Sequence, residues 1–238
     1  MDEWINYFHF KKDVLSTEDY SYPLMDESDL VDELIYRVQA ADLVFLEGKQ
    51  GTGKTRLLME LARKFGNNKQ VVYLDCKNIN STVDIESLMT GKYGWWNKLF
   101  KKIPRNMIVF LDNIQKLDYK NGERIKYFFD QGNIQSVIFT AEDRHNVKFS
   151  ESLWQRIGKR IIQIPELSTT EEKELIQDRI GKNKLNSAQL KMISDASNGN
   201  IKILLDNTRE IFEYMADKKQ KKLSREKIEE IIHGKEEI

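Results

Sequence analysis

The chain has 238 residues, and its 38 basic and 38 acidic residues give a formal net charge of zero at neutral pH. This length leaves room for one α/β core and a smaller second module, while no apolar run approaches the ~20 residues that cross a bilayer. The single cysteine cannot form an internal disulfide and the three scattered histidines lack metal-ligand spacing, so we expect a cytoplasmic protein, away from membranes and without a structural metal.

The N-terminal segment is strongly acidic. Residues 1–35 contain ten acidic residues against Lys11 and Lys12, a net charge of −8, so the remaining chain carries +8. A solvated acidic arm over residues 1–30 is one interpretation, and a main body that binds polyanions is the other.

The first strand is followed by a phosphate-binding pattern. Residues 43–46 form an apolar run typical of a buried parallel strand, and residues 57–62 carry apolar side chains at helical spacing. Residues 48–55 between them match G-x-x-x-x-G-K-[ST], in which glycines let backbone N–H groups approach a phosphate chain. Lys54 would reach the β- and γ-phosphates, and the Thr55 hydroxyl would ligate Mg²⁺. The pattern therefore predicts a nucleoside triphosphate or diphosphate with Mg²⁺, bound by Gly48, Gly51, Thr52, Gly53, Lys54, Thr55 and Arg56.

Four more strand candidates follow, at residues 71–75, 107–111, 136–140 and 160–164. Short apolar runs separated by helical or polar stretches are typical of a parallel sheet covered on both faces. From Ser168 onward the patterns are helical, beginning with Ser168 and Glu171 at capping-box spacing.

We therefore predict an α/β fold with two domains after the acidic arm. The first is a P-loop three-layer α/β/α domain with a five-stranded parallel sheet over residues 31–165, and the second is a small helical lid domain over residues 166–238.

The third apolar run ends in an acid. Residues 107–111 are followed by Asp112, the pattern called Walker B, which would place this carboxylate at the carboxyl edge of the sheet to orient Mg²⁺. Asn113 comes next, where most ATPases with this pattern have a glutamate that polarises water. An amide cannot accept a proton as a carboxylate does, so we expect hydrolysis to be slow, partner-dependent or absent.

These motifs resemble the AAA+ ATPases, and within them the replication-initiator clade. Residues 112–117, Asp-Asn-Ile-Gln-Lys-Leu, are similar to the Walker B segment of the DnaA family, and the Asp-Asn-Ile variant resembles the DnaA-related Hda regulators. The archaeal origin-recognition ATPases and the transposon target-selection ATPases share most of this pattern.

The resemblance implies two sensor residues. Residues 138–144 are similar to the sensor 1 strand, which places Asp143 at the sensor position with Thr140 as the alternative. Residues 199–202 are similar to the sensor 2 helix, which puts Lys202 where the family usually has arginine. Lysine keeps the charge but loses the planar fork.

The resemblance also implies an arginine finger. Residues 153–158 look like the segment that carries this residue, which makes Arg156 the candidate to reach a γ-phosphate bound by a neighbouring subunit. An exposed, locally ion-paired helical arginine is the competing interpretation of Arg156, and Arg160 is an alternative finger.

A basic, aromatic segment lies between the second and third strands. Residues 91–105 contain five basic residues, four aromatic residues and no acids. Such interleaving suits stacking on single-stranded DNA, although apolar residues at helical spacing also fit a helix that buries one face. The candidate nucleic-acid contacts are Lys92, Tyr93, Trp95 and Lys98.

The resemblance implies an ATP–Mg²⁺ switch that regulates or assembles a DNA replication or recombination complex, with a weak, partner-stimulated ATPase activity. Its partner would be a second copy of itself or another AAA+ ATPase, and single-stranded DNA is a further possible ligand. The alternatives are a nucleotide-stabilised adaptor without meaningful turnover, which Asn113 favours, and a transposon or target-selection type of AAA+ ATPase.

Overall fold

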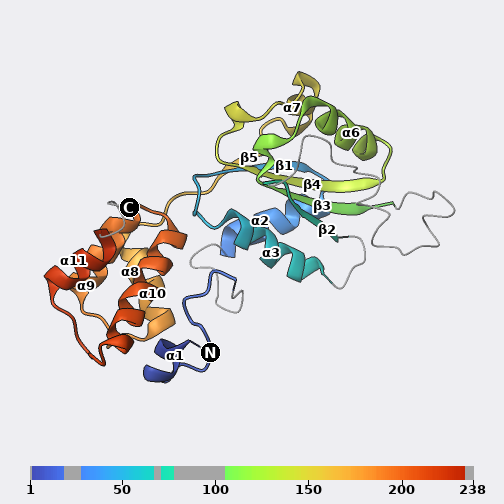
Figure 1. Ribbon diagram of the computed structural model, residues 1–238. Helices are drawn as coiled ribbons and strands as arrows, with labels where there is room; N and C mark the ends of the chain where they lie inside the picture. Colours follow the sequence, from blue (N-terminus) through green and yellow to red (C-terminus); the bar gives the residue numbers. More distant parts are fainter. Residues whose placement is uncertain (1, 19–27, 67–70, 78–104, 234–238) are drawn as a thin grey trace. The chain divides into compact units, whose positions relative to one another are not determined.

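The computed structural model describes residues 2–18, 28–66, 71–77 and 105–233 (Figure 1). These residues fall into two compact units. One lies within residues 26–165, and the other combines residues 1–25 with residues 166–238.

The first unit is built on a five-stranded sheet in the order β2-β3-β4-β1-β5. All neighbouring strands are parallel. The strands are β1 (Leu43–Glu47), β2 (Val71–Asp75), β3 (Met107–Asp112), β4 (Ile134–Ala141) and β5 (Ile161–Gln163). Each strand overlaps an apolar run in the sequence. The inner strands β1, β3 and β4 are buried almost throughout, and a strand covered on both faces needs apolar side chains on both.

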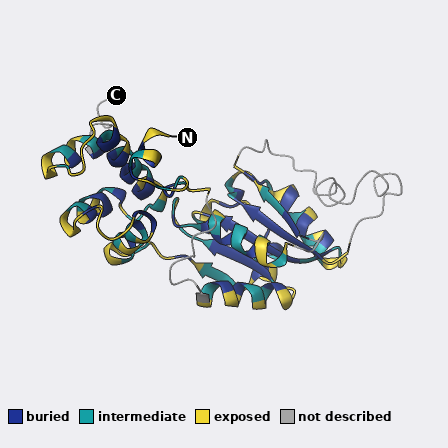
Figure 2. Cartoon of the chain, turned by 90° about the horizontal axis from the view of Figure 1, so that it is seen from below, coloured by how far each residue is buried: buried dark blue, intermediate teal, exposed yellow. Residues whose placement is uncertain are grey.

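Helices cover both faces of this sheet (Figure 1). Helices α2 (Ser28–Gln39) and α3 (Lys54–Phe65) lie on one face, and α6 (Tyr119–Asp130) and α7 (Glu151–Ile157) lie on the other. Figure 2 shows the strands as a buried layer, with the exposed residues on the outer surfaces of the helices. The predicted three-layer α/β/α fold with five parallel strands is therefore confirmed.

The strand order brings distant polar residues to one edge. Strands β1 and β3 both pair with β4 in parallel, so their carboxyl ends lie on either side of β4 at the same edge of the sheet. At that edge Asp112 pairs in register with Asp75 of β2, and Leu46 pairs with Thr140 of β4. Ligands of open α/β sheets bind at this carboxyl edge.

The second unit is helical. Its helices are α8 (Thr169–Ile180), α9 (Ser187–Ser197), α10 (Ile201–Asp217) and α11 (Arg225–His233). Ser168 and Glu171 form the capping box expected from the sequence, with the Ser168 N–H donating to Glu171 Oε2 at 2.6 Å. The predicted helical C-terminal region is confirmed.

The N-terminal segment packs into the helical unit and is not a freely solvated arm over residues 2–18. Helix α1 (Glu3–Tyr7) lies against α10, with Trp4 2% exposed and its ring 6.2 Å from that of Phe212. The Arg179 guanidinium of α8 donates to the carbonyls of Val14 and Ser16 at 3.2 and 2.9 Å. The segment buries its apolar side chains in the helical unit, while Asp2 and Glu3 stay exposed to water.

In the described part of the chain, no helix has the length and apolar character needed to cross a membrane.

Candidate nucleotide-binding site

The loop between β1 and α3 depends on its glycines. Gly51 and Gly53 have φ angles of 85° and 93°, a region that side chains strain to adopt. At Gly48 an added Cβ would lie 2.9 Å from Thr52 Oγ1 and 3.1 Å from the Ile164 carbonyl oxygen. The three glycines therefore allow a close backbone curve directly before the helix N-terminus, the geometry that suits a phosphate chain.

Lys54 opens α3 and is buried, with 5% of its surface exposed. Its ammonium donates to the carbonyls of Gly48 at 2.5 Å and Lys49 at 2.8 Å. Burial lowers the Lys54 pKa, and the negative charges of Glu142 and Asp112 partly oppose that change. A buried ammonium whose hydrogen bonds go to neutral carbonyls is favourably placed for a phosphate, because phosphate oxygens stabilise its charge more strongly.

Asp112 is the centre of a hydroxyl network. Its carboxylate is fully buried, and its Oδ2 accepts hydrogen bonds from Thr55 Oγ1 at 2.6 Å and from the Tyr73 hydroxyl at 3.0 Å. The Thr140 hydroxyl donates to Asp112 Oδ1. The fold thus joins the end of the phosphate loop to the ends of β2, β3 and β4 through one carboxylate.

The donor set at this point fits Mg²⁺ held together with a phosphate chain. The hydroxyl of Thr55 and the carboxylate of Asp112 are hard oxygen ligands of the kind that Mg²⁺ prefers. Among the described residues, no group of three or more His, Cys, Asp or Glu side chains is arranged to hold a metal ion. Mg²⁺ commonly uses one or two carboxylates and completes its shell with water and substrate phosphates, so a small protein donor set suits it.

Asn113 follows Asp112 in a left-handed conformation, with φ 57° and ψ 52°. Its backbone N–H donates to Thr140 Oγ1 at 3.0 Å, and its side-chain amide donates to Asp75 Oδ1, also at 3.0 Å. Asparagine tolerates this backbone conformation better than most residues. The amide at the usual glutamate position therefore faces a carboxylate from the neighbouring strand.

The sequence analysis did not identify Asp75 or Tyr73 as site residues. Both lie near the end of β2, and they reach the site because β2 pairs with β3. The signal available in the sequence was an acid directly after an apolar run, the same signal that identified Asp112.

The two sensor candidates differ in their surroundings. Thr140, the alternative for sensor 1, contacts both Asp112 and Asn113. Asp143 caps the short 3₁₀ turn Arg144–Asn146, with its carboxylate accepting from the His145 N–H at 2.8 Å. Thr140 is therefore part of the Asp112 network, whereas Asp143 lies at the start of the following turn. Lys202 is exposed in the first turn of α10, in the helical unit.

Arg156 lies on α7 and forms an ion pair with Asp130 of α6 at 3.0 Å, with its side chain 54% exposed. Arg160 is tied to the sheet instead, because it donates to the Leu43 carbonyl at 3.2 Å and pairs with Asp42 at 3.5 Å. Of the two arginines, Arg156 has the more exposed side chain.

Of the remaining predicted site residues, Arg56 is partly buried in the first turn of α3. The candidate nucleic-acid contacts lie outside the described residues, namely Lys92, Tyr93, Trp95 and Lys98.

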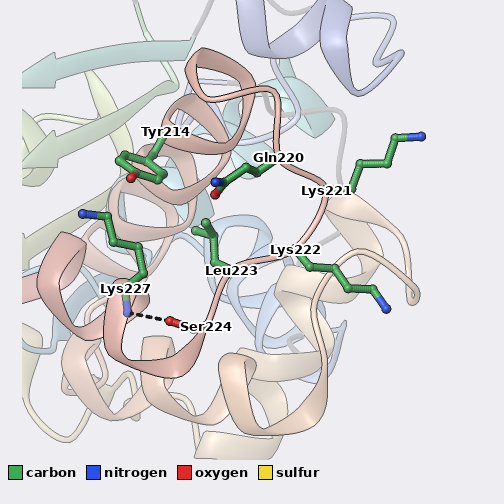
Figure 3. A pocket seen from close by; sticks show the side chains of 7 residues that line it. All are labelled: Tyr214, Gln220, Lys221, Lys222, Leu223, Ser224 and Lys227. Atoms are coloured by element: carbon green, nitrogen blue, oxygen red, sulfur yellow. Dashed lines mark hydrogen bonds between the residues drawn. The ribbon is translucent and has the colours of Figure 1, made fainter.

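A separate hollow lies in the helical unit, between α10 and the start of α11 (Figure 3). Lys221 and Lys222 extend away from it, while Lys227 lies 4.8 Å from the centre of the Tyr214 ring. The Lys227 ammonium also pairs with Glu230 at 2.6 Å. The charged groups that line the hollow do not point toward one common position, so the hollow lacks the arrangement of a catalytic or anion-binding site.

Residues 40–173 match a protein-family model described as an AAA domain, which is more than half of the chain. The protein therefore belongs to this AAA family. Its relatives and structural neighbours include replication initiators.

One relative is the ORC1-type DNA replication protein 1 of Archaeoglobus fulgidus, 27% identical over 165 residues. The match covers 57% of this chain and 40% of that protein, so the chain spans less than half the length of this relative.

Two solved structures have a similar fold. The Aeropyrum pernix Orc1 protein in complex with DNA has a TM-score of 0.76 at 14% identity, covering 97% of this chain and 68% of that one. Domain III of the Thermotoga maritima replication initiation protein DnaA has a TM-score of 0.64 at 16% identity, covering 92% and 97% of the two chains.

Proposed function

We propose that the protein is an ATP- and Mg²⁺-dependent switch of the replication-initiator type. The observation that carries the proposal is the single network in which Asp112 joins Thr55 of the phosphate loop to Thr140 of β4. The same carboxylate thereby contacts the helix that follows the loop and the strand expected to sense the nucleotide. Replacement of these bonds on nucleotide binding would change the positions of both.

In this proposal the glycine loop binds the phosphates through its backbone N–H groups, and Lys54 exchanges its two carbonyl partners for phosphate oxygens. Thr55 and Asp112 hold the cation, which when bound neutralises charge on the β- and γ-phosphates. Nucleotide state then controls association with a second copy of the chain or with a partner ATPase. Regulation or assembly of a replication complex on DNA is supported by the names of the A. fulgidus relative and the A. pernix neighbour. The DnaA- or Hda-like branch is supported by residues 112–117.

A second candidate is a nucleotide-stabilised adaptor with no meaningful turnover. The amide of Asn113 favours it, because an amide does not take a proton from water. Bound nucleotide would then stabilise the fold by mass action without acting as fuel.

Replacement of Arg156 distinguishes the ATP-dependent switch from the nucleotide-stabilised adaptor. A finger that acts on a neighbour's γ-phosphate adds nothing to its own subunit's site, so Arg156→Ala should keep monomer ATP affinity and lose ATP-dependent association. We expect sedimentation to show larger species in ATP than in ADP for the wild type, and equal masses for the variant.

The matched control is Asp130→Asn, which removes the ion-pair partner but keeps the arginine. It should associate in ATP like the wild type. If Asp130→Asn loses association as Arg156→Ala does, the ion pair is structural and Arg156 is not a finger. Equal masses of the wild type in ATP and ADP would exclude homo-assembly, and absence of ATP binding would refute the switch altogether.

A further inference from the structure

An amide occupies the position after the Walker B acid, and an acid lies beside it at the end of the neighbouring strand. The residue after the Walker B acid is Asn113, while the carboxyl end of β2 carries Asp75. The two side chains meet, with Asn113 Nδ2 donating to Asp75 Oδ1 at 3.0 Å, although 38 residues separate them in the sequence. The backbones meet as well, because Asp75 pairs in register with Asp112.

Resting on the proposed function, we infer that Asp75 is the catalytic carboxylate of ATP hydrolysis in this protein. The carboxylate is supplied from β2, and Asn113 holds it in place from β3. Lack of a carboxylate at position 113 then no longer implies an inactive site, because the side chain bonded to Asn113 supplies one.

The contacts of Asp75 suit this role. Among the described residues, both of its hydrogen bonds use Oδ1, which accepts from the Asn113 amide and from the Lys77 N–H at 2.9 Å. These two bonds fix the carboxylate without using Oδ2. The residue is exposed at the carboxyl edge of the sheet, where water has access. Asp112, one strand away, is fully buried, and both of its carboxylate oxygens accept hydrogen bonds from hydroxyl groups.

The chemical step is a displacement at phosphorus. The Asp75 carboxylate accepts a hydrogen bond from a water molecule and takes its proton as the water oxygen bonds to the γ-phosphorus. The bond from that phosphorus to the β–γ bridging oxygen breaks, and ADP leaves with the electron pair. The proton then passes from Asp75 to the released phosphate, which restores the carboxylate and balances ATP plus water against ADP plus phosphate.

A purely structural role for Asp75 is the alternative, since its bond to the Lys77 N–H closes the turn after β2. Asp75→Asn distinguishes the two roles. Its side-chain oxygen still accepts from Lys77, so the turn is kept, but its charge and its capacity to take a proton are lost. Asp118→Asn is the matched control, because Asp118 also accepts one backbone N–H, that of Asn121 at 2.9 Å, and asparagine caps a helix equally well.

We would measure ATP and ADP affinity, ATP turnover, and affinity for ADP–aluminium fluoride, a mimic of the transferring phosphoryl group. For Asp75→Asn we expect unchanged ATP and ADP affinity and turnover lowered about 100-fold or more. Affinity for the mimic should fall about tenfold, since the carboxylate acts only in the transition state. Asp118→Asn should match the wild type in every measurement, and thermal unfolding should confirm that both variants fold.

The exchange variant Asp75→Asn/Asn113→Asp moves the carboxylate to the usual position without changing composition, and it should recover turnover relative to Asp75→Asn. The inference is overturned if Asp75→Asn binds ADP–aluminium fluoride as tightly as the wild type. This binding test decides the matter even where wild-type turnover is too slow to follow. A wild type that fails to bind ATP would instead refute the proposed function, and the inference with it.

Discussion

Removal of the Lys54 ammonium should abolish tight ATP binding without harming the fold. Lys54→Met keeps most of the buried stem and removes the charge, whereas Lys54→Ala also leaves a cavity in a residue that is 5% exposed. In the bound state we expect two charge-assisted bonds to phosphate, each contributing about 1.5–3 kcal/mol, in place of two weaker bonds to the carbonyls of Gly48 and Lys49.

The net loss should therefore be about 2–4 kcal/mol, a rise in the dissociation constant for ATP of about 30- to 1000-fold. Both variants should show it, because the charge rather than the stem makes the contact. Titration with a fluorescent ATP analogue measures it. If Lys54→Met binds the analogue as tightly as the wild type, the assignment of the loop is wrong.

The stability of the nucleotide-free protein supplies an independent test. Burial lowers the Lys54 pKa in the folded state relative to the unfolded state, so the protonated ammonium opposes folding. This penalty is fully present below the lowered folded-state pKa and disappears as pH rises through the interval up to the ordinary lysine value. At neutral pH, Lys54→Met should consequently melt at or above the wild-type temperature without nucleotide. Saturating ATP should reverse the order, because only the wild type gains from the ligand. A variant that melts well below the wild type without nucleotide would contradict the reasoning.

Two further changes test the loop and the N-terminal segment. Gly48→Ala should weaken ATP binding and cost about 1–3 kcal/mol of stability, because its Cβ would lie 2.9 Å from Thr52 Oγ1; unchanged ATP affinity and unfolding would show that the loop can relax. Gly132→Ala separates backbone strain from the close contact, since Gly132, unlike Gly48, has a positive φ but no atom within 4 Å of an added Cβ. Trp4→Ala should lower the free energy of unfolding in urea by about 3–5 kcal/mol, and a loss below about 1 kcal/mol would mean that residues 2–18 do not contribute to the helical core.

The strands and the phosphate loop were predictable because their signals are local. A parallel strand covered on both faces is a continuous apolar run, and the loop needs glycine at fixed spacings for steric reasons that neighbouring residues alone decide. The acid at the end of β3 was equally predictable, since Asp112 directly follows such an apolar run. In each case the physical requirement falls on residues close together in the chain.

The partners of those residues were not predictable, because they depend on strand order. Tyr73 and Thr140 both contact Asp112, yet they come from strands 39 and 28 residues away in the sequence. No local pattern distinguishes Asp75 from any other acid after an apolar run until β2 is placed beside β3. The N-terminal segment is similar, since Val14 meets Arg179 across 165 residues of sequence while a count of charges there indicates only an acidic arm.

The two buried charges of the site, on Lys54 and Asp112, are stabilised in the same way. The hydrogen bonds of Lys54 go to carbonyl oxygens, and those of Asp112 come from hydroxyl groups, so each buried charge is stabilised by neutral dipoles. Had the two formed a direct ion pair, binding would first have to break it, at the cost of leaving a buried charge without its counter-charge. Neutral partners can be exchanged at lower cost, and a phosphate chain with its cation supplies a counter-charge to both residues at once. This arrangement favours tight binding of a nucleotide together with its cation over either one alone.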